Sequence, residues 1–390
     1  MNKPSAHIGF LDYFRGVAIL SVFLFHSLDA SFHHSSLPWH GWLPDFSVSK
    51  AFLFLLPVTM GWAGVAIFFV ISGFCIHYSF YQQGGNWRAF FIRRFFRIYP
   101  PYFFVVLLFA LLYLSNGLNF SHQYVDWYQV IMHLLLIHNF DPLSYQAISP
   151  SFWSIAIEVQ LYLIYPLLLM LVARFGWRRT LILVATCEFL IRGIESLVIM
   201  KMGTDDLDKM WQVSRVTYLL DASPFAYWFS WSLGASIADA FLNGRPLPLA
   251  KSSLAFWSAL VFGSHCIKPL TPFFFTIVAV WTATAISKLL IQNRTIPVPS
   301  FCLSHLRLTG IWSYSIYLLH QSLIVMGLGA LLVICPAAKN DALLRFGFCL
   351  VLWFAIMPIG NLWYRICELP SIACGKRIAC PRPPTGKSPN

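Results

Sequence analysis

The chain has 390 residues, of which 58% are apolar, 17% are aromatic and only 11% are charged. Because charged residues make up about a quarter of an average soluble domain, this composition excludes both a soluble protein and a globular enzyme held by one membrane anchor. The net charge of +12 does not indicate nucleic-acid binding, since the Lys and Arg residues lie in short segments between apolar runs. The sequence therefore predicts an all-α, polytopic integral membrane helix bundle.

Apolar runs of about 20 residues, the length that a helix needs to cross a bilayer, recur along the sequence. Many of them begin or end with Trp or Tyr, as spanning helices do at the membrane interface. We expect about ten transmembrane helices in one domain that covers residues 1–377. The expected helices cover residues 9–29, 60–80, 99–116, 152–173, 180–200, 218–241, 252–267, 270–290, 309–334 and 344–364.

Positively charged residues gather at the cytoplasmic ends of spanning helices. With the N-terminus in the cytoplasm, 18 of the 27 Lys and Arg residues lie on that side, which predicts that both termini are cytoplasmic. Residues 125–140 are apolar enough for an eleventh span, but a crossing there would move the basic cluster at 174–179 outside. We therefore expect an interfacial or re-entrant helix at 125–140. The Pro-rich segment 378–390 is expected to be a disordered cytoplasmic tail.

The first expected helix carries two polar side chains, Arg15 and His26, that a helix facing lipid normally excludes. Eleven helical residues return to within roughly 20° of the starting azimuth and rise by roughly 16 Å, so both side chains lie on one stripe. Asp12 precedes Arg15 by three residues, close enough to pair with it and to lower the cost of its burial. The separation predicts two different roles for Arg15 and His26.

Five motifs occur along the chain in one order. They are LDYFRGVAILSVFLFH (11–26), FFVISGF (68–74), FFIRRFFRIYPPY (90–102), SPSFWSIAIEVQLYLIYP (149–166) and YSIYLLHQ (314–321). In this order and spacing they resemble the membrane-bound acyltransferase-3 family, which modifies surface sugars, glycans and some small molecules with acyl groups. Residues 364–377 are similar to the usual end of that family, so the resemblance covers about residues 9–377.

This resemblance implies a ten-helix bundle that takes an acyl group, usually acetyl, from cytoplasmic acyl-coenzyme A (acyl-CoA). It delivers the group to a hydroxyl of a glycan or another acceptor at or across the membrane. The implied partners are acyl-CoA (acetyl-CoA), the acceptor and the lipid bilayer, in a multi-pass protein of the cell membrane such as the bacterial cytoplasmic membrane. Direct transfer needs no metal. The acceptor, the acyl chain length, the oligomeric state and the choice between direct transfer and an acyl-enzyme relay stay open.

His26 is the expected catalytic base, because an imidazole titrates near neutral pH and can take a hydroxyl proton there. Glu158 is the only charged residue of the expected helix 152–173 and lies at a similar depth, so we expect it to orient His26. Two alternatives stay open. His26 can simply hydrogen-bond a neighbouring helix, and Glu158 can be satisfied by Trp153 or by a tyrosine of another helix.

Arg15 is expected to bind the acyl donor, because a guanidinium is always charged and offers forked donors to a phosphate or a thioester oxygen. Arg94 and Arg97 lie in the expected cytoplasmic loop after the second span and match the Arg-x-x-Arg of the family. They can hold the nucleotide phosphates. A basic cytoplasmic loop that only contacts anionic lipid explains them equally well.

Ser72 and Gly73 form a small surface that can open a slot for the pantetheine arm of the donor, although helix packing explains them equally well. Ser72 as an acyl-carrying nucleophile is less favoured, because no base is placed beside it in the sequence. His320 and Tyr317 are expected to line the same cavity and to contact the acceptor. For His320 the alternative is a role in closing a hydrogen-bond network.

The rival function is a proton-coupled membrane transporter, whose cavity would also be lined by buried Arg, His and Glu. Discontinuous helices and inverted repeats would favour it, and the sequence shows neither. A non-catalytic membrane scaffold is a third reading, which requires that His26 and Glu158 can be replaced without loss of function.

Overall fold

The computed structural model describes residues 8–32, 37–39, 41, 50–116, 125–202, 218–292 and 301–379. Throughout this part of the chain the regular structure is helical and no β-strand occurs, which confirms the expected all-α class. Of the expected tail, residues 378–379 end the last helix, and residues 380–390 lie outside the described residues.

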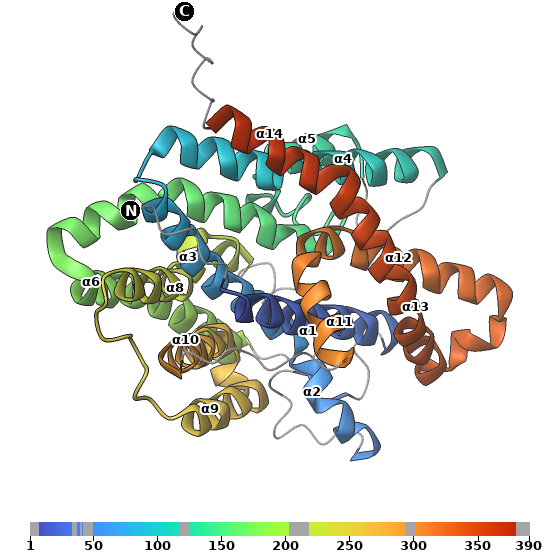
Figure 1. Ribbon diagram of the computed structural model, residues 1–390. Helices are drawn as coiled ribbons and strands as arrows, with labels where there is room; N and C mark the ends of the chain where they lie inside the picture. The colour runs from blue at the N-terminus through green and yellow to red at the C-terminus, as the bar shows by residue number, and fades with distance from the viewer. Residues whose placement is uncertain are drawn as a thin grey trace, which may run out of the picture.

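Seven helical segments are long and apolar enough to cross a membrane. Figure 1 shows these segments packed against one another as a bundle. The seven contain α1 (Phe10–Phe32), α3 (Gly64–Gln82), α4 (Trp87–Asn116), α6 (Trp153–Met202), α10 (Phe274–Gln292), α12 (Ser313–Ile334) and α13 (Ala342–Trp363). The shorter helices are α2 (Leu56–Thr59), α5 (Trp127–Leu134), α8 (Trp228–Leu242), α9 (Leu254–Cys266), α11 (Phe301–Ile311) and α14 (Leu369–Ala379).

Four of the expected spans explain why seven segments are found and not ten, because two of them form one segment and the other two are too short. Two of them, 152–173 and 180–200, lie within α6, which bends at Gly176, visible at the left of Figure 1. Gly176 has φ 74° and ψ 164°, a conformation that glycine adopts without strain. Helices α8 and α9 have 15 and 13 residues, and a rise of about 1.5 Å per residue makes both shorter than a bilayer core. The count of ten and the side of the termini stay predictions.

Helix α5 is too short to cross a membrane, as expected for residues 125–140. Its eight residues rise by about 12 Å. Asp126 caps its start by accepting hydrogen bonds from the backbone N–H groups of Tyr128 and Gln129, while the Gln129 side chain accepts from the N–H of Asp126. A short, separately capped helix therefore occupies this segment, and its interfacial position stays a prediction.

Helix α4 begins at Trp87, twelve residues before the expected span, so the expected loop around Arg94 and Arg97 is wrong. Pro100 and Pro101 lie inside this helix. Pro100 has no N–H, which leaves the carbonyl four residues earlier, that of Phe96, without its helical donor. The Ser371 hydroxyl of α14 donates to this carbonyl oxygen, and α14 lies beside α4 at the top of Figure 1. The proline pair is thus accommodated by a contact from the other end of the chain.

Helices α3 and α8 approach so closely that only glycine fits at their crossing. A Cβ atom on Gly73 would lie 1.9 Å from the carbonyl oxygen of Trp231, and one on Gly234 would lie 1.9 Å from that of Val70. Small residues allow such backbone-to-backbone packing between membrane helices. Gly73 therefore sets the distance between α3, which carries Ser72, and α8.

A Gly73→Ala variant is expected to lose about 1–3 kcal/mol of stability, because the added methyl group must push the two backbones apart. The thermal midpoint of the detergent-solubilised protein measures this loss. Gly329→Ala on α12 is the matched control, because a Cβ there meets nothing within 4 Å. Equal midpoints for the two variants would contradict the close crossing.

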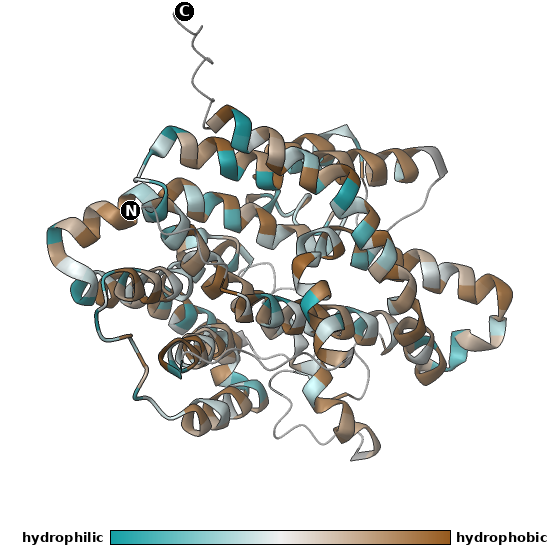
Figure 2. Cartoon of the chain, in the orientation of Figure 1, coloured by the Kyte–Doolittle hydropathy of each residue, from teal (hydrophilic) through white to brown (hydrophobic). Residues whose placement is uncertain are grey.

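The surface of the bundle is suited to lipid. Figure 2 shows apolar residues along most of the helices, with polar residues on α14 and near helix ends. On α12 and α13, Val333, Ile334 and Phe354 are 82%, 82% and 77% exposed. Large exposed apolar side chains of this kind are solvated by acyl chains in a membrane protein. The helices therefore form a multi-pass membrane protein.

Candidate active site

A cavity of about 130 Å³ lies among α1, α3, α4, α6 and α12. Apolar side chains such as Val65, Phe68 and Ile155 form part of its wall. The rest is polar, and six residues singled out from the sequence line it although they come from five helices. These six are Arg15, Ser72, Arg94, Arg97, Glu158 and Tyr317.

The guanidinium of Arg15 is held by two contacts at the cavity. Its Nη1 donates to Asp12 Oδ1 at 3.0 Å, which confirms the pairing expected from their spacing. Its Nη2 contacts the Cys75 sulfur at 3.1 Å, and Cys75 also lines the cavity. Asp12 is buried, so the ion pair offsets part of the cost of placing both charges inside the bundle.

Arg94 and Arg97 reach the cavity from α4, three residues apart on one helix face. Arg97 pairs with Glu368 at 2.6 Å, and Glu368 also accepts a hydrogen bond from Ser315. Arg94 donates to the Ser79 hydroxyl at 3.2 Å, and no carboxylate pairs with it in the described part of the chain. Arg15 and Arg97 therefore each pair with a carboxylate, whereas among the described residues Arg94 does not.

Glu158 is bound by hydroxyl groups within the cavity. Its Oε1 accepts hydrogen bonds from Ser72 at 2.8 Å and from Tyr162 at 2.5 Å, and Trp231 Nε1 donates to the same Ser72 hydroxyl at 3.3 Å. The expected direct pairing of Glu158 with His26 is therefore wrong. A serine on α3 and a tyrosine one turn further along α6 satisfy the carboxylate instead.

His26 forms its hydrogen bond with His320. The distance between His26 Nδ1 and His320 Nε2 is 2.8 Å. His26 is half-buried, whereas His320 has no exposed surface. Neither His26 nor His320 lines the cavity, so the expected place of His320 in the cavity wall is wrong. The alternative of a hydrogen-bond network fits its contacts with His26 and Tyr317, and a contact of either histidine with the acceptor stays a prediction.

Tyr317 connects the cavity to the histidine pair. Its ring lines the cavity, and its hydroxyl donates to the Ser151 carbonyl at 2.9 Å and lies 2.7 Å from the Ser154 hydroxyl. His320 follows three residues later on the same face of α12. The pair His26–His320 therefore lies one helical turn beyond the Tyr317 wall.

Gly73 does not line the cavity, although it was expected to bind the donor. It lies against α8, and its neighbour Ser72 faces the cavity. The Cβ position of Gly73 points at the Trp231 carbonyl of α8, away from the cavity. For Gly73 the helix-packing alternative is the correct one.

Several cavity residues were not predicted. Cys75 follows Ser72 by three residues and Tyr162 follows Glu158 by four, so helical spacing alone would have placed each on the face of its predicted neighbour. Glu368 lies in a segment that was matched to the family without a role being given to it. No local signal indicates its pairing with Arg97, because 271 residues separate them in the sequence.

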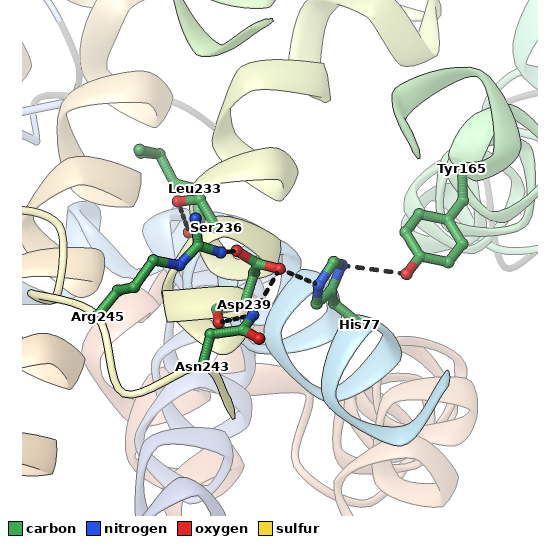
Figure 3. A network of polar contacts seen from close by, with 7 residues as sticks. All are labelled: His77, Tyr165, Leu233, Ser236, Asp239, Asn243 and Arg245. Atoms are coloured by element: carbon green, nitrogen blue, oxygen red, sulfur yellow. Dashed lines mark hydrogen bonds and ion pairs between the residues drawn. The ribbon is translucent and has the colours of Figure 1, made fainter. Parts of the chain in front are cut away.

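A second polar network lies outside the cavity (Figure 3). His77 on α3 stands between the Tyr165 hydroxyl of α6, 3.1 Å from Nδ1, and the Asp239 carboxylate of α8, 3.5 Å from Nε2. Asp239 also contacts Arg245 and Asn243. This network ties three helices together. Within the described ranges no group of three or more His, Cys, Asp or Glu side chains is arranged to hold a metal ion.

Comparison with known proteins relates the chain to acyltransferases. The model of the acyltransferase-3 family, described as an acyltransferase domain, matches residues 8–360. Nodulation protein 10 of Rhizobium leguminosarum bv. viciae is 30% identical over 193 residues, which are 46% of this chain and 47% of that protein. Acyltransferase MdmB of Streptomyces mycarofaciens is 27% identical over 167 residues, which are 42% and 40% of the two chains. The matched segments span less than half of each relative, and no solved structure matches significantly.

Proposed function

This chain belongs to the acyltransferase-3 family, and from that premise we propose that it is an O-acyltransferase of the cell membrane, with a single catalytic domain over residues 1–377. It moves an acyl group, most often acetyl, from cytoplasmic acyl-CoA to a hydroxyl of a glycan or another acceptor. The observation that carries this proposal is one cavity that gathers Arg15, Arg94 and Arg97 and ends one helical turn from the His26–His320 pair.

The arginines are the donor-binding end of the site. Acyl-CoA is anionic, and a guanidinium binds phosphates with two parallel hydrogen bonds. Arg94 is the main phosphate ligand in this proposal, because Arg15 and Arg97 already have carboxylate partners. The apolar wall around Phe68 and Ile155 then accepts the uncharged pantetheine and acyl part of the donor.

His26 is the base. Its Nε2 takes the proton of the acceptor hydroxyl while the hydroxyl oxygen forms a bond to the thioester carbonyl carbon. The tetrahedral intermediate collapses, the carbon–sulfur bond breaks, and the imidazolium returns the proton to the leaving CoA thiolate. The products are the ester and free CoA, and no metal takes part in these steps.

Glu158 retains a catalytic role in this proposal, through the cavity rather than through His26. Its carboxylate offsets part of the arginine charge and fixes the hydroxyls of Ser72 and Tyr162, which both donate to it, in the cavity wall. The single O–H of each of these hydroxyls already donates to Glu158, so each presents only oxygen lone pairs, which accept hydrogen bonds, to the rest of the cavity. Tyr317 also lines the cavity, where it can contact substrate.

The two ends of the site are separated along α1. Arg15 and His26 lie eleven residues apart on one stripe, or roughly 16 Å by the helical rise. A donor bound from the arginine end therefore presents its thioester towards His26, and the acceptor approaches from the far side. We propose direct transfer without a covalent intermediate, and an acyl adduct trapped on His26 would instead indicate a relay.

The test is turnover by the purified full-length protein in lipid nanodiscs. Labelled acetyl-CoA, propionyl-CoA and butyryl-CoA are supplied with a panel of mono- and oligosaccharides, and free CoA and acylated products are measured by mass spectrometry. We expect turnover that survives Lys339→Ala, an exposed position outside the cavity. Absence of CoA release with every donor, together with proton-coupled solute uptake into vesicles, would instead favour the transporter.

A further inference from the structure

The two histidines are part of a longer chain of hydrogen bonds. His26 Nδ1 lies 2.8 Å from His320 Nε2, and His320 Nδ1 lies 2.8 Å from the backbone carbonyl oxygen of Tyr317. The two rings are tilted by 30° with centroids 5.0 Å apart. Each histidine thus uses a nitrogen for a defined partner, and His26 Nε2 has no hydrogen-bond partner among the described residues.

The backbone carbonyl of Tyr317 determines which nitrogen atoms of the two histidines carry a proton. A carbonyl oxygen only accepts hydrogen bonds, so His320 Nδ1 carries a hydrogen and donates it to Tyr317. A neutral imidazole has a single N–H, so His320 Nε2 holds a lone pair and accepts. The proton between the rings therefore belongs to His26 Nδ1, and the lone pair of neutral His26 lies on Nε2.

We infer that His320 is a positioning residue that holds His26 in the tautomer a base requires; this inference rests on the proposed function of His26. Without an acceptor beside Nδ1, the His26 imidazole is free to carry its proton on Nε2, where no lone pair is then left for the hydroxyl. His320 also receives a hydrogen bond from the His26 imidazolium that forms during transfer. A carboxylate has the corresponding role in serine hydrolases, and here a neutral histidine backed by a carbonyl replaces it.

Burial explains why a neutral partner fits this position. His320 has no exposed surface, and Ile316, Tyr317 and Leu319 around it on α12 are also buried. A carboxylate enclosed there would need a compensating charge, whereas a neutral imidazole requires only its two hydrogen bonds. Neither histidine is among the residues that line the cavity, and His320 contacts His26 directly, so in this proposal His320 acts on the reaction through His26.

Two variants separate this role from a packing role. His320→Gln places a side-chain amide oxygen near the position of Nε2 and can still accept from His26 Nδ1, whereas His320→Leu fills similar space without an acceptor. We expect His320→Leu to lose about 10- to 100-fold in kcat, as is typical when the partner that orients a functional histidine is removed. The KM for acetyl-CoA should change little, and His320→Gln should recover most of the kcat.

A double variant tests whether His320 acts through His26. His26→Asn keeps a donor near the Nδ1 position but has no Nε2 lone pair, so adding His320→Leu to it should cause no further loss of activity. A further tenfold loss in the double variant would overturn the inference, and so would a His320→Leu enzyme with the wild-type kcat. Equal loss in His320→Gln and His320→Leu, at unchanged thermal midpoints, would also overturn it.

Chemical labelling of His26 tests the inference without a measurement of turnover. Diethyl pyrocarbonate reacts with an unprotonated imidazole nitrogen, and mass spectrometry measures its addition to His26. We expect several-fold slower addition in His320→Leu than in wild type and near-normal addition in His320→Gln. If the wild-type protein releases no CoA but shows this labelling pattern, the proposed function is wrong and the positioning role of His320 stands. If turnover depends on His26 but substitution of His320 changes neither the labelling nor kcat, the proposed function stands and the positioning role is wrong.

Discussion

A His26→Asn variant is expected to lose roughly 100- to 10,000-fold in kcat, the usual contribution of a positioned general base. Asparagine keeps an N–H near the Nδ1 position, so the contact with His320 can persist while the basic nitrogen is removed. Steady-state rates of CoA release with acetyl-CoA and the saccharide panel measure the loss. The KM for acetyl-CoA should remain within a few-fold of wild type, because the donor-binding arginines are untouched.

His305→Asn is the matched control for this change. His305 is exposed on α11, away from the cavity, so the same substitution there should leave kcat unchanged. If His26→Asn retains more than a tenth of the wild-type kcat, His26 is not the base. The His26–His320 pair would then be only a contact between α1 and α12.

An Arg94→Met variant is expected to raise the KM for acetyl-CoA by about 10- to 100-fold, the range that corresponds to the loss of one charged hydrogen bond. Methionine preserves much of the apolar stem, although it removes the guanidinium, whose central carbon lies 6.0 Å from the centroid of the Phe90 ring. Because no carboxylate of the described residues depends on Arg94, its removal leaves no buried charge unpaired and stability should change little. Initial rates over a range of acetyl-CoA concentrations separate KM from kcat.

Arg179→Met removes the same charge from an exposed position at the bend of α6, outside the cavity. It should leave both KM and kcat unchanged. A donor that lacks the nucleotide, such as acetyl-pantetheine, should respond only weakly to Arg94→Met, because it carries no phosphate for the guanidinium to bind. Equal effects of Arg94→Met on acetyl-CoA and acetyl-pantetheine would place Arg94 outside the phosphate site.

Contacts between side chains of the same helix could be predicted from the sequence. The Asp12–Arg15 pair is a contact three residues apart on one helix, and the structure confirms it. The convergence of Arg94, Glu158 and Tyr317 on one cavity was expected only through the family motifs, since spacing gives no distance between helices. The predictions failed where the partner lies far along the chain, as for His26 and His320, which are 294 residues apart.

The start of α4 could not be predicted for a different reason. The basic residues at 88–97 are typical of a cytoplasmic loop, so the sequence favoured a loop before residue 99. The Ser371 hydroxyl donates to the carbonyl that Pro100 leaves without a partner, and this compensation comes from a segment 275 residues away. A prediction from neighbouring residues alone cannot include such a contact.

Because α14 packs on α4, residues near the end of the chain contribute to the arginine end of the site. Glu368 and Ser371 hold Arg97 and the turn before Pro100, yet both lie after residue 360, where the match to the family ends. The histidine pair, by contrast, lies entirely within the matched region. In the proposed function, the arginine end of the site therefore draws on a segment after residue 360, whereas the histidine pair does not. Exchanging residues 364–379 with those of a relative is expected to change donor binding through Arg97 and to leave the His26–His320 contact in place.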